Sequence, residues 1–503
     1  MKKIILATVN ARYIHTSLGL RYLFANLSEL KEHSLILEFI KSDKIEDIAE
    51  AILKENPSII GLSVYIWNAV EIAELVVLLK KVAPEKIIIL GGPEVSHFPF
   101  RLNYDSADYI IQGEADLLFY EVCRDLLNDK RPSKKVLQAE PVDLKNIELP
   151  YEYYTEDDIK NRVIYMEVSR GCPFSCEFCL SSIDKLVRYF DLEIILKHLE
   201  KLWKRGVRKI KFIDRTFNLN FDVVNQILDF FLSKEPPYLI HFEVIPEHFP
   251  KLLKEKLKLF PPASLQLEVG IQTLNPEIAK NISRNINIDK IFKNITFLEK
   301  ETKIHVHFDL IIGLPGESLE SFGENLNKLM KHTDSEIQIG ILKMLSGTNL
   351  CRHDQKYGMK YSDSPPYDLL QNDLIPFSEM QKMKRFARFW DLYYNSGNFV
   401  KSVHLIWDDG NVYFGFYEFS LWVYENTSST WKISLDRLAE LLFEYLTEIK
   451  KHDVQKIADL LVQDILGFAG RRPPTFLRKF VKDFPDYDKK NISRSNKRQI
   501  KHN

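Results

Sequence analysis

Three cysteines are the clearest chemical feature of the sequence. Cys172, Cys176 and Cys179 lie close together, directly after an apolar stretch that predicts a strand. Gly171 and Pro173 disfavour a helix there, so we expect a loop whose three thiolates can bind one metal centre. Three thiolates suit a [4Fe–4S] cluster with one iron left open, whereas a structural zinc site usually needs four protein ligands. The spacing therefore predicts a cluster rather than a zinc ion or three free thiols.

Composition narrows the class of protein. The other two cysteines, Cys123 and Cys351, are too few and too far apart for a disulfide framework. A chain of 503 residues suggests about three domains, and its net charge of −1 points to neither nucleic acid nor a membrane. No apolar run approaches the ~20 residues that span a bilayer, so we expect a cytoplasmic protein without a membrane partner.

The segment from Ser169 to Cys179 resembles the radical S-adenosylmethionine (SAM) superfamily, whose mark is C-x3-C-x-aromatic-C, with Phe178 as the aromatic residue. The resemblance implies that SAM chelates the open iron through its amino and carboxylate groups. An electron, from a donor such as flavodoxin or ferredoxin, would then cleave SAM to methionine and a 5′-deoxyadenosyl radical. The radical chemistry belongs to the cofactor, and the protein positions it and excludes water.

Later strand ends look like the SAM-binding positions of this superfamily, and the resemblance covers roughly residues 160–350. Asp214 and Thr216 follow the second barrel strand, where the family often has a Gly-Gly-Glu motif for the SAM amino group. Gln272 and Thr273 carry donors and acceptors suited to ribose hydroxyls. Gly313 lies in a glycine-containing segment that lets the backbone approach adenine. The assignment of these segments to SAM binding rests on their order along the chain after the cysteines.

The first ~140 residues alternate predicted strands with helical patterns, which indicates a doubly wound parallel sheet. They resemble the cobalamin-binding domain of B12-dependent radical SAM proteins, in which Ser63 and Gly91, 28 positions apart, would meet the nucleotide tail. Glycines there present no Cβ to the tail, and a serine can hydrogen-bond it. The matching residues implied to bind cobalamin are Ser63, Tyr65, Trp67, Gly91, Gly92 and Glu114.

The lower face of the cobalt is expected to lack a histidine. Domains that ligate cobalt carry Asp-x-His-x-x-Gly, whereas here Gly19 comes one position late after His15 and no Asp precedes it. His15 is interpreted as a loop residue, and the family implies a base-off cobalamin covered by a loop around Trp67. Methylthiotransferases are the rival family, but their second cluster needs three cysteines, and only Cys123 precedes residue 160.

The predicted fold class is therefore α/β, in three domains. From the two resemblances we expect residues 1–140 to form a Rossmann-like cobalamin-binding domain and 158–350 a partial (β/α)6 radical SAM barrel. Residues 376–503 are expected to form a mostly helical domain, and a linker is expected at ~132–160. In the last of these, Ser378 and Gln381 predict a capping box. The stripe that follows predicts core packing rather than a cofactor box; it comprises Met380, Met383, Phe386, Phe389, Trp390 and Tyr393.

Three functions remain open from the sequence. The first is an enzyme that uses SAM and cobalamin for radical methylation or rearrangement at an unactivated carbon of a small metabolite. The second is radical modification of RNA, since residues 471–503 carry 11 Lys and Arg against 3 Asp and Glu. The third is a corrinoid carrier or sensor, which the intact cysteine loop disfavours. The sequence predicts neither the substrate nor the oligomeric state.

Overall fold

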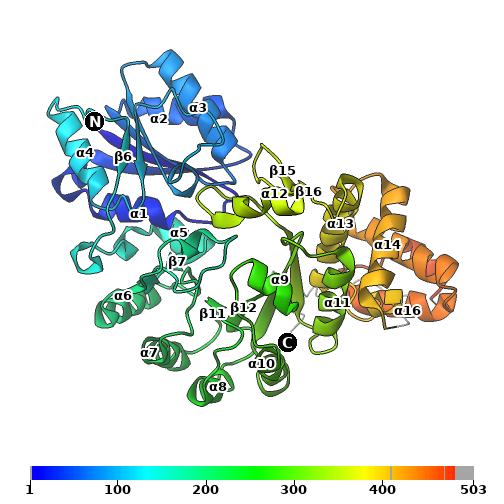
Figure 1. Cartoon of the computed structure of the whole chain (residues 1–503). Helices are drawn as coiled ribbons and strands as arrows, with labels where there is room; N and C mark the ends of the chain where they lie inside the picture. The colour runs from blue at the N-terminus through cyan, green and yellow to red at the C-terminus, as the bar shows by residue number, and fades with distance from the viewer. Residues whose placement is uncertain (1–2, 408–409, 469–470, 482–503) are drawn as a thin grey trace.

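A six-stranded parallel sheet forms the N-terminal part of the chain (Figure 1). The computed structural model describes residues 3–407, 410–468 and 471–481. The strand order is β2-β1-β3-β4-β5-β6, as a doubly wound domain requires. The elements are β1 (Ile4–Asn10), α1 (Leu18–Ala25), β2 (Ser34–Ile40), α2 (Ile45–Lys54), β3 (Ile59–Ser63), α3 (Ala69–Val82), β4 (Ile87–Gly91), β5 (Tyr109–Gln112), α4 (Leu118–Leu127) and β6 (Val136–Gln138).

Two features of this region differ from the sequence prediction. The helical pattern of the sequence extends over residues 18–30, which predicts one helix there, but α1 ends at Ala25, because Asn26 caps it and a 3-10 turn over Ser28–His33 follows. The expected linker is partly structured. It supplies β6, which adds the last strand to the sheet, and α5 (Glu156–Asn161), whose N-terminus has a capping box formed by Thr155 and Asp158. The prolines of this stretch therefore separate short elements rather than mark a free linker.

The second sheet confirms the predicted partial barrel. Its six parallel strands follow the order β14-β13-β12-β11-β10-β7, and α6, α7, α8 and α10 lie along its outer side (Figure 1). The strands are β7 (Ile164–Met166), β10 (Lys209–Phe212), β11 (Leu239–Val244), β12 (Leu265–Gln272), β13 (His305–Ile312) and β14 (Glu336–Ile341). The helices are α6 (Leu192–Lys204), α7 (Phe221–Leu232), α8 (Lys251–Leu257), α9 (Pro276–Asn281), α10 (Ile288–Glu301) and α11 (Leu319–Met330). A short hairpin of β8 (Ser169–Arg170) and β9 (Arg188–Tyr189) frames the cysteine loop.

Side chains alternate along the barrel strands between a hydrophobic outer layer and a polar lumen. Phe212 and Phe242 are buried under the helices, and their rings lie 4.9 Å apart. The alternate positions meet inside the barrel, where the Glu268 carboxylate lies 3.0 Å from His241 Nε2 and 3.5 Å from Lys211 Nζ. Since barrel interiors are usually filled by apolar side chains, a charged lumen suits a polar substrate or cofactor.

The C-terminal part is mainly helical and packs against α11 and β14 (Figure 1). All six residues of the predicted stripe are fully buried, which confirms core packing. The capping box was wrong: α13 begins at Phe377 with Pro376 as its N-cap, so Ser378 already lies inside the helix. The elements are α12 (Asp354–Tyr357), β15 (Lys360–Tyr361), β16 (Leu369–Gln371), α13 (Phe377–Trp390), α14 (Val412–Thr427), α15 (Leu435–Glu444) and α16 (Val454–Leu466).

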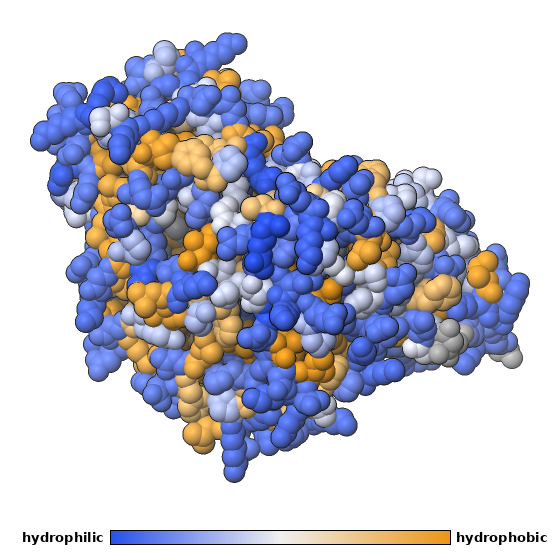
Figure 2. Space-filling view, viewed as in Figure 1, coloured by the Kyte–Doolittle hydropathy of each residue, from blue (hydrophilic) through white to orange (hydrophobic). Residues whose placement is uncertain are grey.

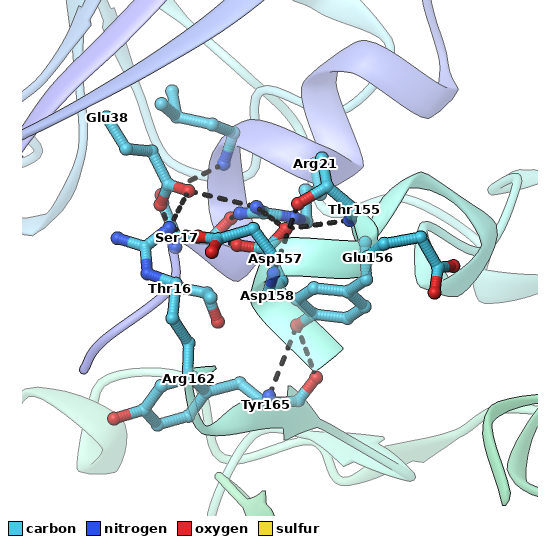
Figure 3. A network of polar contacts seen from close by, with 12 residues as sticks. Thr16, Ser17, Arg21, Glu38, Thr155, Glu156, Asp157, Asp158, Arg162 and Tyr165 are labelled. Carbon is cyan, nitrogen blue, oxygen red and sulfur yellow. Dashed lines mark hydrogen bonds and ion pairs between the residues drawn. The ribbon is translucent and has the colours of Figure 1, made fainter. Parts of the chain in front are cut away.

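A buried ring of four charges joins the first sheet, α5 and the entrance to the barrel (Figure 3). Arg21 bonds Glu38 at 2.9 Å and Asp158 at 2.8 Å. Arg162 bonds the same two carboxylates at 2.7 and 3.0 Å. Each charge in the ring has two opposite partners, and removing any one would leave buried charges uncompensated. The ring therefore fixes how the N-terminal sheet sits on the barrel.

The face of the molecule in Figure 2 is mostly hydrophilic, and its hydrophobic residues form small separate groups. Among the described residues, no helix combines the length and the apolar character needed to span a bilayer.

Candidate cofactor and active site

A cavity of about 760 Å³ lies between the C-terminal edge of the first sheet and the mouth of the barrel. Ligands of open α/β sheets and of barrels bind at these strand ends. The N-terminal domain contributes Ser63, Tyr65, Trp67, Gly91, Gly92 and Glu114 to the lining, and the barrel contributes Tyr165, Glu167, Arg170, Asp214 and Arg215. The cavity thus brings together all six predicted cobalamin residues and one predicted SAM residue, Asp214.

Ser63 and Gly91 fit a buried ligand. The Ser63 side chain is buried, and its hydroxyl has no hydrogen-bond partner within the described part of the chain. A buried hydroxyl normally has a partner, and a ligand tail in the cavity would supply one. A Cβ on Gly91 would meet only the Ile111 carbonyl oxygen, at 3.7 Å, so the protein itself does not require glycine there. Both observations agree with the cobalamin tail implied by the sequence.

Gly92 has a structural role in addition to its predicted place on the cavity wall. Its φ is +108°, and a Cβ would lie 2.6 Å from the Val64 carbonyl oxygen. L-residues rarely adopt this conformation, so the turn after β4 needs glycine whether or not a ligand is present. A substitution at Gly92 would therefore distort the loop before it could obstruct a ligand.

The loop expected beneath the cobalt is built around Asn68. The rings of Tyr65 and Trp67 stack with centroids 4.3 Å apart, and the Trp67 side chain is about 40% exposed. Asn68 is fully buried, accepts a hydrogen bond from the Tyr65 amide at 2.7 Å and donates to the Val9 carbonyl at 3.0 Å. It thereby fixes the stacked pair over the end of β1.

His15 lies in the loop between β1 and α1, as expected, and lines the cavity. Its Nδ1 is 2.7 Å from the Tyr165 hydroxyl of β7, and burial lowers the pKa of the imidazole. The hydroxyl orients the ring, a task that a carboxylate performs at most histidine ligands. His15 therefore marks the contact between the first sheet and the barrel.

The three cysteines lie on the loop after β8, at the barrel mouth. Cys172 is buried and Cys176 and Cys179 are half-buried, all as free thiols. Burial raises the pKa of Cys172 and Cys176, while Arg284 beside Cys176 and Arg215 near Cys172 act in the opposite direction. Because metal ligation requires thiolates, these two cations favour the ligating form. The donor set of three thiols fits a cluster with one open iron.

Asp214 holds the start of this loop. Its carboxylate accepts hydrogen bonds from the Ser169 hydroxyl at 2.5 Å and from the Val168 amide at 3.0 Å. Burial raises its pKa to about 7. Both oxygens are used within the protein, so Asp214 is placed to position the loop rather than to contact the SAM amino group. Thr216 is also buried, behind the same strand end.

Two arginines of the β8–β9 hairpin connect the loop to the N-terminal domain. Arg170 bonds Asp116 at 2.8 and 3.1 Å and Glu167 at 3.0 Å. Arg188 forms an ion pair with Glu114, whose pKa it lowers against the effect of burial. Glu114 therefore serves in a domain contact on the cavity wall. Neither arginine was predicted as a functional residue from the sequence, where the only available signal was their position beside the cysteines.

The far side of the loop is held by Glu177, which lies between the second and third cysteines and is 5% exposed. It pairs with His353 at 2.8 Å and with Arg352, and it accepts a hydrogen bond from Ser283. These partners come from the segment after β14 and the turn after α9. This contact could not be predicted from the sequence, because the partners of Glu177 are distant from it in the chain.

Gln272 and Thr273 have separate environments. Gln272 has a φ of +67° at a bulge in β12, and its amide lies over Gly270 on the lumen face. Thr273 is 0% exposed, and its hydroxyl donates to Glu317 at 2.8 Å. The predicted ribose contact therefore fits Gln272 and does not fit Thr273.

Gly313 also has a packing role that the sequence did not predict. A Cβ at this position would lie 2.5 Å from Leu369 Cδ2 and 3.2 Å from Met380 Cε, at a φ of +88°. Close packing of the C-terminal segments accounts for this glycine, without any need for an adenine ring.

Sequence models of three families match the chain. The B12 binding domain matches residues 4–123, the radical SAM superfamily matches residues 166–329, and a family described as a protein of unknown function, DUF4080, matches residues 355–502. The first two matches fall on the two sheets that enclose the cavity.

Individual proteins agree with these matches. An uncharacterised methyltransferase, PH0819, of Pyrococcus horikoshii is 25% identical over 66% of this chain and 77% of its own length. The cobalamin-dependent radical SAM methyltransferase TokK of Streptomyces tokunonensis is 22% identical over 63% of this chain, which spans about half (51%) of TokK. The solved structure of the cobalamin-dependent SAM radical enzyme OxsB superposes with a TM-score of 0.61 over 92% of this chain and 79% of OxsB, at 14% identity. The last comparison shows a shared fold.

Proposed function

Because this chain belongs to the cobalamin-dependent radical SAM proteins, we propose that it is a methyltransferase that acts on an unactivated carbon of a small molecule. When bound, the [4Fe–4S] cluster and SAM supply a carbon radical, and cobalamin supplies a transferable methyl group. Methyl transfer is favoured over rearrangement because the similar proteins PH0819 and TokK are both named methyltransferases.

The observation that carries the proposal is the shared cavity. It extends from Ser63 and Gly91 in the first sheet to Arg170 and Gly171 at the start of the cysteine loop. A corrinoid in the first sheet would therefore face the mouth of the barrel. Such an arrangement holds reacting groups close together, which lowers the entropic cost of the reaction.

Residues of the chain would perform distinct tasks around this cavity. Cys172, Cys176 and Cys179 would hold the cluster, and Gln272 would contact SAM. Ser63 and Gly91 would accommodate the cobalamin tail. Tyr65 and Trp67 would cover its lower face and keep water away.

The lumen below would receive the substrate. The Asp309 side chain points into it from β13 and forms no hydrogen bond with the described residues. Burial and the neighbouring Glu268 and Glu243 raise its pKa well above the usual range for a carboxyl group. A carboxyl group without a partner in the protein can hydrogen-bond a polar group of a substrate. The position of Asp309 in the lumen thus supports a polar small molecule as the substrate.

We also propose a flavodoxin or ferredoxin as the electron donor, in the cytoplasm. Phe174, Ile183 and Leu186 are exposed by 40%, 44% and 68% on and beside the cysteine loop. Exposed apolar side chains at a redox centre suit transient docking of a carrier.

Two alternatives are less well supported. RNA modification relied on the basic tail, most of which, residues 482–503, lies outside the described residues. A carrier or sensor would not need the two clamps on the cysteine loop, Arg170 with Asp116 and Glu177 with His353. These contacts support a catalytic role for the cluster.

The test is an anaerobic assay of the reconstituted holoprotein. It uses SAM with a deuterated methyl group, a reductant and a metabolite extract, followed by mass spectrometry. We expect 5′-deoxyadenosine together with a small molecule that gains the label. Labelled RNA with unlabelled small molecules would favour the second candidate, and absence of SAM cleavage by a protein with full cluster content would favour a carrier.

A further inference from the structure

Two histidines and a glutamate converge at the N-terminal ends of two barrel strands, and none of them lines the cofactor cavity. His305 and His307 occupy alternate positions at the start of β13, so both face the same side of the strand. Glu336 begins β14 and stands directly opposite His307 in the strand register. All three side chains are buried, with exposures of 4%, 6% and 1%.

The ligand atoms of these residues are arranged around a common point. His307 Nε2 lies 3.0 Å and His305 Nε2 lies 3.4 Å from different oxygens of Glu336. One donor atom from each residue lies within 4.8 Å of the other two. Neither Glu336 oxygen has an aligned hydrogen-bond partner within the described part of the chain, despite these short approaches. Imidazole nitrogens and carboxylate oxygens at these distances can instead bind the same cation, placed between them.

We propose that His305, His307 and Glu336 bind a divalent cation of the zinc class. Two imidazoles and a carboxylate form a donor set that zinc prefers, and the carboxylate would compensate part of its charge. A ligating imidazole needs its other nitrogen held by an outer partner. The Gln338 side-chain amide lies 3.1 Å from His307 Nδ1 and fits that role, with its oxygen as the acceptor. The Gln266 amide lies 3.0 Å from both nitrogens of His307, so a cation on Nε2 would take the place of Gln266 at that nitrogen.

The site would stabilise the open edge of the barrel. β14 is the last strand of the sheet, and Asn395 covers its edge by bonding both the amide and the carbonyl of Ile337, at 3.0 and 2.9 Å. A cation held by β13 and β14 would tie this strand to the sheet beside the helical domain. The fourth position remains for water or a lumen group. None of these residues lines the cofactor cavity or belongs to the cysteine loop, so the inference is independent of the proposed function.

The test counts metals in the holoprotein. Anaerobically reconstituted protein, with its thiols occupied by iron, is titrated with chelator-buffered Zn²⁺, and zinc and iron are measured by mass spectrometry. We expect about one zinc per chain in addition to the iron, with X-ray absorption showing nitrogen and oxygen ligands at about 2.0–2.1 Å and no sulfur. Gln338→Ala should weaken zinc binding about 10–100-fold, and Glu336→Gln or His307→Gln at least as much.

His241→Gln is the matched control, because His241 forms a similar pair with Glu268 in the same lumen, at 3.0 Å, and belongs to no three-residue group of this kind within the described chain. It should retain the zinc. Wild type that binds no zinc, sulfur ligands in the absorption spectrum, or equal loss in His241→Gln would each overturn the proposal. If the ligand variants fail to fold, the absorption spectrum of wild type decides the question alone.

Discussion

Arg170 and Asp116 join the cysteine loop to the N-terminal domain by two hydrogen bonds, Nη1 to Oδ2 at 2.8 Å and Nη2 to Oδ1 at 3.1 Å. Arg170 stands two residues before Cys172, and its guanidinium also lies over the Tyr22 ring of α1, 4.8 Å from the centroid. The position of Cys172, the first of the three proposed cluster ligands, is thus coupled to the domain expected to hold cobalamin.

Asp116→Asn should loosen this coupling. The amide keeps the shape but loses the charge, and one of the two bonds becomes unfavourable, which costs about 1–3 kcal/mol at a buried site. We expect faster hydrogen exchange at residues 169–172 and slower methyl transfer, with cluster content unchanged. Asp105→Asn, at an exposed aspartate of the same domain, is the control. Equal exchange in all three proteins would show that the pair does not restrain the loop.

Single Cys172→Ala, Cys176→Ala and Cys179→Ala variants should lose the visible absorption of the [4Fe–4S] cluster and all SAM cleavage. Removing one thiolate leaves a second iron without a protein ligand. Cys351→Ala should behave like wild type because that thiol is exposed and outside the motif. Loss of the cluster in Cys351→Ala alone would contradict the ligand assignment.

Substitutions of the two adjacent glycines, Gly91 and Gly92, should have different effects, the first on cobalamin affinity and the second on stability. Gly91→Val places its branched side chain where the tail would lie, and a clash of only about 1.4 kcal/mol weakens binding about tenfold. Ser63→Ala should lose about 0.5–1.5 kcal/mol of affinity, the value of one neutral hydrogen bond. Gly92→Ala should instead lower the free energy of unfolding, since its Cβ would lie 2.6 Å from the Val64 carbonyl oxygen. The measurements are hydroxocobalamin titration and urea unfolding.

Cobalamin affinity that is unchanged in Gly91→Val would place the tail elsewhere. The Co(II) electron paramagnetic resonance spectrum addresses the lower face. We expect no nitrogen splitting in the wild-type spectrum, because the His15 ring is held by Tyr165. The His15→Ala variant should therefore give the same spectrum.

Gln272→Ala and Thr273→Val should affect different properties of the protein, the first its affinity for SAM and the second its stability. Gln272→Ala should weaken SAM binding by about 0.5–1.5 kcal/mol and leave stability unchanged, since its amide faces the lumen. Thr273→Val removes the hydroxyl that donates to buried Glu317 and should lower the free energy of unfolding by about 1–3 kcal/mol. Isothermal titration with SAM and urea unfolding distinguish the two. Weaker SAM binding by a fully stable Thr273→Val variant would restore its predicted ribose contact.

Asp214 should impose a pH dependence on stability. Its folded pKa is raised to about 7 by burial, whereas an unfolded aspartate titrates near 3.9. Between about pH 4 and pH 7 the unfolded chain releases this proton and the folded chain retains it. The contribution of Asp214 to the free energy of unfolding therefore falls as pH rises, by at most about 1.4 kcal/mol per unit, and becomes constant above about pH 7.

The measurement is anaerobic urea unfolding of wild type and Asp214→Asn between about pH 5 and pH 8. The stability of wild type relative to the variant should fall up to about pH 7, because asparagine does not titrate. A difference that does not vary with pH would mean that the carboxyl stays ionised in the folded chain.

The sequence by itself determined the family resemblance, the order of the domains and most of the strands. Cys172, Cys176 and Cys179 could be recognised as a motif because cluster ligands on one loop lie close together along the chain. The strands could be recognised because a buried parallel strand such as Ile87–Gly91 is a continuous apolar run. The stripe in α13 was equally clear, because burial on a helix leaves a period of 3.6 residues.

Only the tertiary structure decided which residues face the cofactors and which hold the scaffold. Asp214, Glu114 and Thr273 have the chemistry of ligand contacts, yet their side chains bond to Ser169, Arg188 and Glu317. The reason is physical: a polar group is satisfied by whichever partner lies within about 3 Å, and that partner can come from anywhere in the chain. Ser63 is the converse case, because its buried hydroxyl lacks a partner within the described residues, and only the packed structure could show this.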